Sequence, residues 1–198
     1  MNGTVQNNVK NILIAGVGGQ GTLLASKLMG KCFIGEGYDV KVSEVHGMSQ
    51  RGGSVVTYVK YSDETVWSPV INEGEADIII SFELLEAARW VGFLKKGGTL
   101  VVNDQKIAPM PVIMGSAQYP EDIAGKLRSL GVNLKLFDAL HLAEQAGSAK
   151  ATNVVLMGAV ANAMDFSEEM WQKALEECVP PKFLELNRKA FALGRGQN

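Results

Sequence analysis

Short apolar runs alternate along the chain with segments in which apolar residues recur every three or four positions. The apolar runs, rich in branched residues and bounded by glycine or polar residues, predict buried strands at 11–17, 38–45, 77–82, 99–103 and 132–137. The segments with helical spacing predict helices at 22–35, 83–96, 121–130 and 139–146. This alternation predicts an α/β fold in which a Rossmann-like open sheet is the middle of three layers.

Two segments between the strands depart from the simple alternation. Residues 54–60 and 65–67 flank a polar turn and predict a β-hairpin inserted after the second strand, which makes the sheet mixed. Residues 109–115 predict a short strand or extended segment. In the helix predicted at 83–96 we expect Lys95 and Lys96 in the last turn, where the helix dipole favours cations, with glycines ending the helix.

The last third of the chain, residues 153–194, contains no strand pattern. It predicts three C-terminal helices, broken near residues 165–167 and at the Pro180-Pro181 pair. We expect one domain over residues 11–198, preceded by a polar tail at residues 1–10.

Composition narrows the class of protein. The chain is 46% hydrophobic and 20% charged with a net charge of −2, and it has no basic run, which argues against nucleic-acid or membrane-surface binding. No apolar run reaches transmembrane length and the polar start lacks a signal-peptide core, so we expect a cytoplasmic protein. Two cysteines, Cys32 and Cys178, with His46 and His141 are too few for an iron–sulfur cluster or a structural zinc site, so we expect no metal on this chain alone.

The glycine-rich loop at 16–21, GVGGQG, lies between a predicted strand and a predicted helix. This is the context of the dinucleotide-binding fingerprint, in which glycines make the turn, admit a phosphate and allow close helix–strand packing. Glu44, at the end of the second strand, stands roughly where a ribose-binding carboxylate is expected. An NAD(P)-binding oxidoreductase is therefore one interpretation; glycines that serve only tight packing around an empty or partner-filled crevice are another.

A second loop, at 47–53, carries more than a connection between strands needs. It holds three glycines, a flexible Met48 suited to a partner surface, and Arg51, whose planar fork of donors fits a carboxylate or phosphate. A surface turn with a solvated arginine is the simplest alternative. Because both loops follow strands expected to be neighbours, we predict that they converge on one face. The candidate ligand- or partner-facing residues are Gly18, Gly19, Gln20, Gly21, Glu44, His46, Gly47, Met48, Gln50, Arg51, Gly52 and Gly53.

Beyond these patterns, the chain resembles a known family. The 16–21 loop and the segment SEVHGMSQRGGSV at 43–55 are similar to the gamma-type subunits of 2-oxoacid:ferredoxin oxidoreductases, among which the likeness is greatest to the indolepyruvate members. Further similarity lies in SPVINEGEADIIISFELLEAAR at 68–89, GGTLVVN at 97–103 and TNVVLMGAV at 152–160.

The resemblance implies a subunit of an enzyme that oxidatively decarboxylates a 2-oxoacid, with indolepyruvate or another arylpyruvate as a candidate. It implies that the product is an acyl-coenzyme A, that ferredoxin takes the electrons, and that a large companion subunit carries thiamine diphosphate and the iron–sulfur clusters. The glycine loops would then face the companion and the entrance for substrate or coenzyme A, and no catalytic residue is assigned on this chain. A non-catalytic interaction module stays open as a further alternative.

Overall fold

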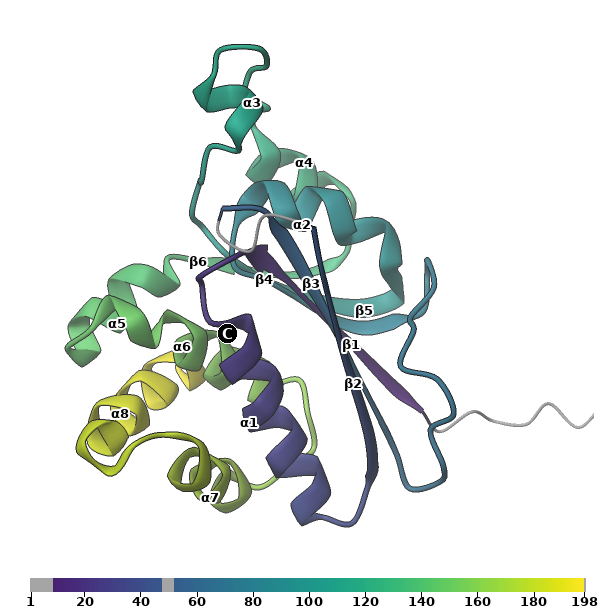
Figure 1. Ribbon diagram of the computed structural model, residues 1–198, viewed down its shortest axis with the longest axis vertical. Helices are drawn as coiled ribbons and strands as arrows, with labels where there is room; N and C mark the ends of the chain where they lie inside the picture. The colour runs from purple at the N-terminus through teal and green to yellow at the C-terminus, as the bar shows by residue number, and fades with distance from the viewer. Residues whose placement is uncertain (1–8, 48–51, 198) are drawn as a thin grey trace, which may run out of the picture.

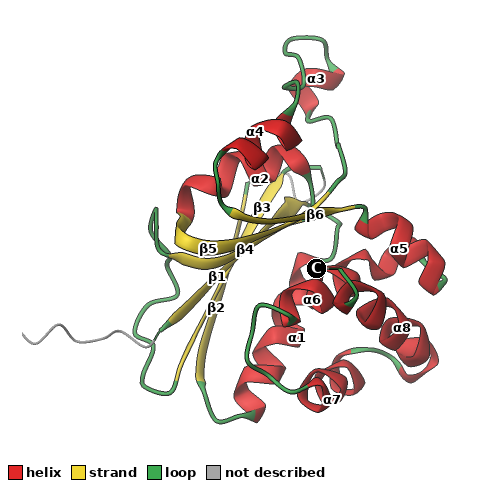
Figure 2. Cartoon of the chain, turned by 180° about the vertical axis from the view of Figure 1, so that it is seen from behind, coloured by secondary structure: helices red, strands yellow, loops and turns green. Residues whose placement is uncertain are grey.

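The computed structural model describes residues 9–47 and 52–197 of the 198-residue chain. A six-stranded sheet with the order β2-β3-β1-β4-β5-β6 forms the middle layer, and helices cover both of its faces (Figures 1 and 2). The strands are β1 (Lys10–Val17), β2 (Asp39–His46), β3 (Ser54–Ser62), β4 (Ala76–Ser81), β5 (Leu94–Asn103) and β6 (Asn133–Phe137). The predicted α/β fold with a mixed sheet is confirmed.

The sheet is parallel in one half and antiparallel in the other. Strands β1, β4, β5 and β6 run parallel, whereas β3 is antiparallel to both β1 and β2. Alternate residues of β1 enter the two opposite cores: Ile12 and Ile14 face one, and Leu13 and Ala15 face the other. Because helices cover both sides, the strand reads as a continuous apolar run.

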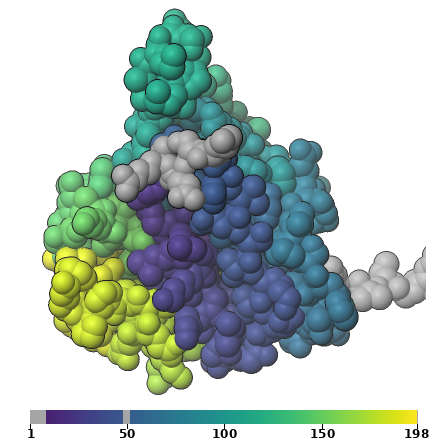
Figure 3. Space-filling model, in the orientation of Figure 1, coloured from purple at the N-terminus to yellow at the C-terminus, as the bar shows by residue number. Residues whose placement is uncertain are grey.

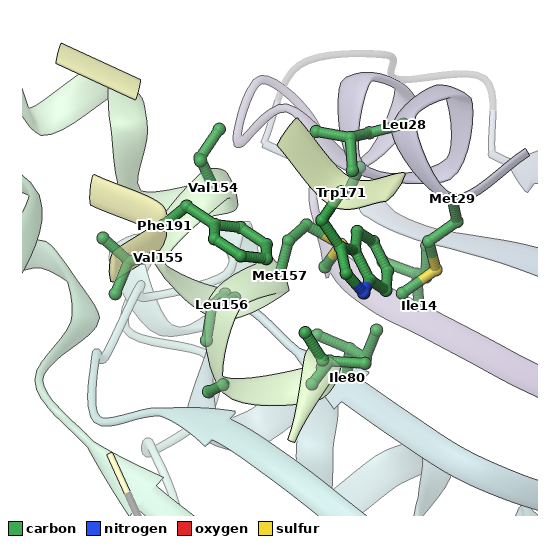
Figure 4. Packing of buried hydrophobic residues seen from close by; sticks show 14 of the residues in the cluster. Ile14, Leu28, Met29, Ile80, Val154, Val155, Leu156, Met157, Trp171 and Phe191 are labelled. Atoms are coloured by element: carbon green, nitrogen blue, oxygen red, sulfur yellow. The ribbon is translucent and has the colours of Figure 1, made fainter. Parts of the chain in front are cut away.

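One helical layer is much larger than the other. It contains α1 (Thr22–Gly35), α5 (Ala139–Ala146), α6 (Thr152–Ala161), α7 (Glu168–Cys178) and α8 (Leu184–Arg195). Its core surrounds the buried ring of Trp171, which lies among Leu28, Met157 and Phe191 (Figure 4). The opposite layer contains α2 (Leu84–Trp90) and α4 (Ile123–Ser129), and α3 (Met110–Ile113) stands apart at the tip of a projection. The three predicted C-terminal helices and their two breaks are confirmed.

Helices α6 and α8 touch through their backbones. A Cβ atom on Gly158 of α6 would lie 2.1 Å from the carbonyl oxygen of Phe191, and one on Gly194 of α8 would lie 1.9 Å from that of Val155. Both distances are far inside van der Waals contact, and the obstructing atoms belong to backbone that cannot rotate away. This crossing therefore admits only glycine at both positions.

The predicted hairpin assigned the wrong pairing partner, residues 65–67, to the strand at 54–60. Residues 65–67 form no strand, and β3 instead pairs with β2 on one side and β1 on the other. The segment between His46 and Ser54 therefore connects two antiparallel neighbours. Strand β3 suits this interior place because Val59 and Val56 bury apolar side chains on its two faces, whereas Trp67 is 90% exposed. As a consequence β1 and β2 are not neighbours, contrary to the expectation for the two strands that precede the glycine loops.

Two further expectations about local structure were wrong. The helix predicted at 83–96 ends at Trp90, and after a single 3₁₀ turn at Val91–Phe93 the chain enters β5, so Lys95 and Lys96 lie in a strand. There Lys95 forms an ion pair with Asp77 at the start of β4. Residues 109–115 contain the short helix α3 in place of a strand, because a proline is tolerated in the first turn of a helix.

Candidate functional site

The structure brings the two glycine loops together at the carboxyl end of β1. The Gly18 N–H donates to the Gly53 carbonyl at 2.9 Å, and the Gly52 N–H donates to the Gly18 carbonyl at 3.4 Å. These bonds continue the antiparallel ladder of β1 and β3 past its last pair, Val17 and Ser54. The 16–21 loop and the end of the 47–53 loop thus form one continuous backbone surface. Met48, Gln50 and Arg51 lie outside the described residues.

Two glycines of the fingerprint have a packing role in this fold. Gly21, at φ +87°, precedes α1, and a Cβ there would lie 2.6 Å from the Asn153 Nδ2 atom. Asn153, at the start of α6, donates through that atom to the Gly21 carbonyl at 3.3 Å. A Cβ on Gly16 would lie 3.2 Å from that of Phe82. Close approach of α6 and of Phe82, which directly follows β4, accounts for these glycines without a bound phosphate.

This packing role predicts coupling between Gly21 and Asn153. We expect Gly21→Ala to lower the free energy of unfolding by about 2 kcal/mol, from a strained backbone and the contact with Asn153. Gly19→Ala is the matched control, because Gly19 has φ +104° but no atom within 4 Å of its added Cβ, so it measures backbone strain alone. In urea titrations, the Gly21→Ala/Asn153→Ala pair should be less destabilised than the sum of its parts by about 1 kcal/mol. Strict additivity would contradict the packing role.

Gln20 uses its amide within the chain. Its Oε1 accepts from the Val17 N–H at 2.7 Å, and its Nε2 donates to the Phe82 carbonyl at 3.1 Å and to the Gln105 Oε1 at 3.3 Å. Asn103 donates to the same two oxygens and accepts from the Ala139 N–H at 2.9 Å. Three amide side chains therefore tie the ends of β1, β4 and β5 to the start of α5, across the crevice that a dinucleotide occupies in Rossmann folds.

Glu44, His46 and Gly47 lie farther along the same edge, on or next to β2, and all three are exposed. Glu44 accepts from the Thr57 hydroxyl at 3.4 Å, and the His46 Nδ1 lies 3.0 Å from the Gly47 carbonyl oxygen. Because β3 separates β2 from β1, Glu44 is two strand spacings, about 10 Å, from the strand that feeds the fingerprint loop. It does not occupy the place of a ribose-binding carboxylate.

A pair of buried acids that the sequence analysis did not identify lies at this edge. Glu83 and Glu86, at the start of α2, are 1% and 2% exposed. Glu83 caps the helix by accepting from the Glu86 N–H at 2.9 Å with one oxygen, and its other oxygen accepts from the Ile107 N–H at 3.1 Å and from the Tyr119 hydroxyl. Burial, together with this contact to Glu83, raises the pKa of Tyr119, which keeps its hydroxyl a donor.

Glu86 connects the end of the 47–53 loop to the guanidinium group of Arg89. Its carboxylate accepts from the Ser54 hydroxyl at 2.5 Å and forms an ion pair with the Arg89 Nη1 atom at 2.6 Å. Ser54 directly follows Gly53, and the Arg89 side chain is 45% exposed. A cavity of about 200 Å³ lies here, lined in part by Gly53, Ser54, Glu86 and Arg89. The arrangement places the ion-paired guanidinium of Arg89 close to the backbone of Gly53 and Ser54, which suits a carboxylate or phosphate.

The sequence contains one pattern from which the position of these two acids at a helix start could have been predicted. Glu83 and Glu86 have the three-residue spacing of a capping box at the start of a helix that follows an apolar strand. That spacing identifies a helix start, but it does not reveal that Ser54 and Tyr119 cover the two carboxylates.

The thiols and acids of the described residues assemble no metal centre, since no three His, Cys, Asp or Glu side chains among them are placed to share an ion. Burial raises the pKa of Cys32 to about 12 and also raises that of Cys178. Both side chains are therefore protonated at neutral pH. Within the same residues, no helix has the length and apolar character needed to cross a bilayer.

A second, larger cavity lies away from both glycine loops. Its volume is about 1260 Å³, and it opens at the amino ends of β1 and β4. Charged side chains of both signs line it, among them Lys10, Asp77 and Lys95. The candidate site at the carboxyl edge is thus the smaller of these two cavities.

Comparison with known proteins gives one consistent family. Residues 11–197 match the family described as pyruvate ferredoxin/flavodoxin oxidoreductase. The chain is 44% identical to indolepyruvate oxidoreductase subunit IorB of Thermococcus kodakarensis and also of Pyrococcus horikoshii, in each case over 93% of both chains. Its fold is similar to that of the gamma subunit of a keto/oxoacid ferredoxin oxidoreductase from Geobacter sulfurreducens, with a TM-score of 0.69 and 26% identity over 93% of this chain and 95% of that one.

Proposed function

Because the chain belongs to the pyruvate ferredoxin/flavodoxin oxidoreductase family, we propose that it is the gamma-type subunit of a 2-oxoacid:ferredoxin oxidoreductase that acts on indolepyruvate or another arylpyruvate. The observation that carries the proposal is the 44% identity to indolepyruvate oxidoreductase subunits over 93% of both chains. Relatives named for 2-oxoglutarate or for pyruvate and ketoisovalerate are 25–29% identical, which favours the arylpyruvate class.

In this proposal the assembled enzyme releases the carboxyl group of the 2-oxoacid as carbon dioxide, transfers the acyl group to coenzyme A and passes two electrons to ferredoxin. We assign thiamine diphosphate and the iron–sulfur clusters to a large companion subunit. This chain has two cysteines, Cys32 and Cys178, fewer than the four that typically hold an iron–sulfur cluster, which supports that assignment.

The part of this chain that we propose to face the companion and the entering substrate or coenzyme A is the carboxyl edge of the sheet. Gly18, Gly52 and Gly53 form a backbone surface there that lacks side chains, and Arg89 stands beside it, held by Glu86. Arg51 directly precedes Gly52 in the sequence, and its assignment to the same surface rests on the sequence alone. Both guanidinium groups would meet an anionic group of substrate, coenzyme A or companion.

Co-expression with the companion subunit tests the proposal. We expect the purified complex to reduce a viologen dye with indolepyruvate or phenylpyruvate in the presence of coenzyme A, and to do so faster than with pyruvate or 2-oxoglutarate. Arg51→Ala is expected to lower kcat/KM at least about tenfold, as for loss of a charge-assisted contact in the reacting complex, whereas the exposed Arg128→Ala on α4 serves as the matched control. A stable complex that turns over no 2-oxoacid would contradict the proposal and favour an interaction module. Full activity in Arg51→Ala would remove the role of that residue.

The NAD(P)-binding alternative finds little support in this fold. The Gln20 side chain bonds to Val17 and Phe82 next to the end of β1, and β3 separates Glu44 from that strand. Calorimetry with NAD(H) and NADP(H) separates the two functions, since a dinucleotide enzyme would release heat with one of them and a gamma-type subunit would not.

A further inference from the structure

Residues 107–120 project from the body of the molecule, and we refer to them as the knob (Figures 1 and 3). Its tip, helix α3 and the residue after it, exposes three large apolar side chains: Met110 at 59%, Ile113 at 66% and Met114 at 73%. No charged residue lies between Lys106 and Glu121, in a chain of which 20% of residues are charged. Exposed apolar side chains clustered on a projection are typical of a protein–protein contact.

The knob is held at its neck by one buried carboxylate. A single oxygen of Glu83 accepts from the Ile107 N–H and from the Tyr119 hydroxyl. The two segments at the base of the knob, which form its neck, are therefore joined through the same atom. The other oxygen of Glu83 caps α2, which packs on the sheet. The knob therefore has a fixed direction relative to the body.

The tip is also ordered by its own contacts. The Pro111 carbonyl oxygen accepts from the Ser116 N–H at 2.9 Å, from the Ser116 hydroxyl at 3.0 Å and from the Ala117 N–H at 3.1 Å. Pro109 and Pro111 fix two backbone dihedrals on the way into α3. A segment that is ordered before binding loses little conformational entropy when a partner covers it.

We propose that the knob inserts into an apolar recess on the companion subunit, an inference that rests on the proposed function. The area of the tip implies that it forms only one part of a larger contact. Three partly exposed apolar side chains offer on the order of 300 Å², well below the roughly 800 Å² that each partner of a stable complex buries. The contact must therefore continue over neighbouring surface, and Met110 and the 52–54 segment line one cavity at the knob's base, which supplies that continuity.

Charge argues against a second copy of this chain as the partner. The larger of the two cavities described above is lined by charged side chains, among them Lys10, Asp77 and Lys95. A charge-free apolar tip does not complement that lining, and a convex tip does not complement itself. A recess with apolar walls on another chain complements the tip in both charge and shape.

The test measures binding of the companion subunit to variants of the full chain by biolayer interferometry. We expect Ile113→Asp and Met114→Glu each to weaken binding at least tenfold in the dissociation constant, with an unchanged melting temperature of the isolated chain because both side chains are exposed. Leu130→Asp, at an apolar residue 55% exposed at the end of α4, is the matched control and should bind as the wild type does. Tyr119→Phe, which removes one neck contact and leaves the tip intact, should weaken binding several-fold.

Wild-type binding by Ile113→Asp and Met114→Glu would overturn the inference. So would a wild-type chain that forms dimers by analytical ultracentrifugation and becomes monomeric in Ile113→Asp, since the occupant would then be a second copy. The readout separates this inference from the proposed function: a complex that forms through the knob but oxidises no 2-oxoacid contradicts only the function.

Discussion

Replacing Gly194 by alanine is expected to lower the free energy of unfolding by about 3 kcal/mol, the upper end of the range for overpacking a core. The added Cβ would lie 1.9 Å from the Val155 carbonyl oxygen, so α6 and α8 must separate by more than an ångström. Separation loosens the core around Phe191, whose ring packs against Trp171 and lies in the same cluster as Met157 (Figure 4). For a chain of this length, the melting temperature should fall by roughly 6–12 °C.

Gly30→Ala provides the matched control, because Gly30 is also buried within a helix but has no atom within 4 Å of an added Cβ. Alanine is the better helix former, so this variant should be neutral or more stable by up to about 1 kcal/mol. Urea titrations followed by circular dichroism measure both variants. If Gly194→Ala were no less stable than Gly30→Ala, the two helices would not be in backbone contact.

The second large effect is expected at Glu83. Glu83→Ala leaves three donors without their acceptor, the N–H groups of Glu86 and Ile107 and the Tyr119 hydroxyl, and should lower the free energy of unfolding by about 3 kcal/mol. Glu83→Gln should cost about 1–2 kcal/mol, because both oxygens accept and an amide nitrogen would face a donor.

Limited proteolysis gives this prediction a local measurement. Because alanine cannot join Ile107 to Tyr119 at the neck, the 107–120 segment should be cut faster in Glu83→Ala than in the wild type, under conditions in which the rest of the chain stays folded. Glu121→Ala, an exposed acid directly after the segment, should change neither stability nor cleavage rate. Equal cleavage of Glu83→Ala and the wild type would show that Glu83 does not hold the neck.

The elements predicted best from the sequence are those whose secondary structure depends on their own side chains alone. Helix α1 begins and ends at the predicted residues, and α5 does as well, because apolar spacing marks both and a glycine lies at or directly after the end of each. The place of β3 was missed because a strand's own residues show that it is buried but not which strands it pairs with. The early end of α2 was missed because Lys95 and Lys96 suit the last turn of a helix as well as an exposed part of β5.

The candidate site was predictable in outline only. Glycine spacing was enough to mark the loops that meet at Gly18 and Gly53. The use of Gln20 within the chain depends on Phe82 and Gln105, which are 62 and 85 residues away. The burial of Glu83 depends likewise on Tyr119, and contacts over such separations leave no local pattern in the sequence.

The turn between β2 and β3 has a consequence for how this protein can change over evolutionary time. Strand β3 is anchored along its whole length by β1, and β2 lies at the free edge of the sheet. Residues added to or removed from the 47–53 turn therefore leave the register of the parallel strands untouched. The 16–21 loop has no such freedom, because Gln20 and Asn153 fix its path. Insertions and deletions that retune recognition at this edge should accumulate in the turn, while the neighbouring loop keeps its length.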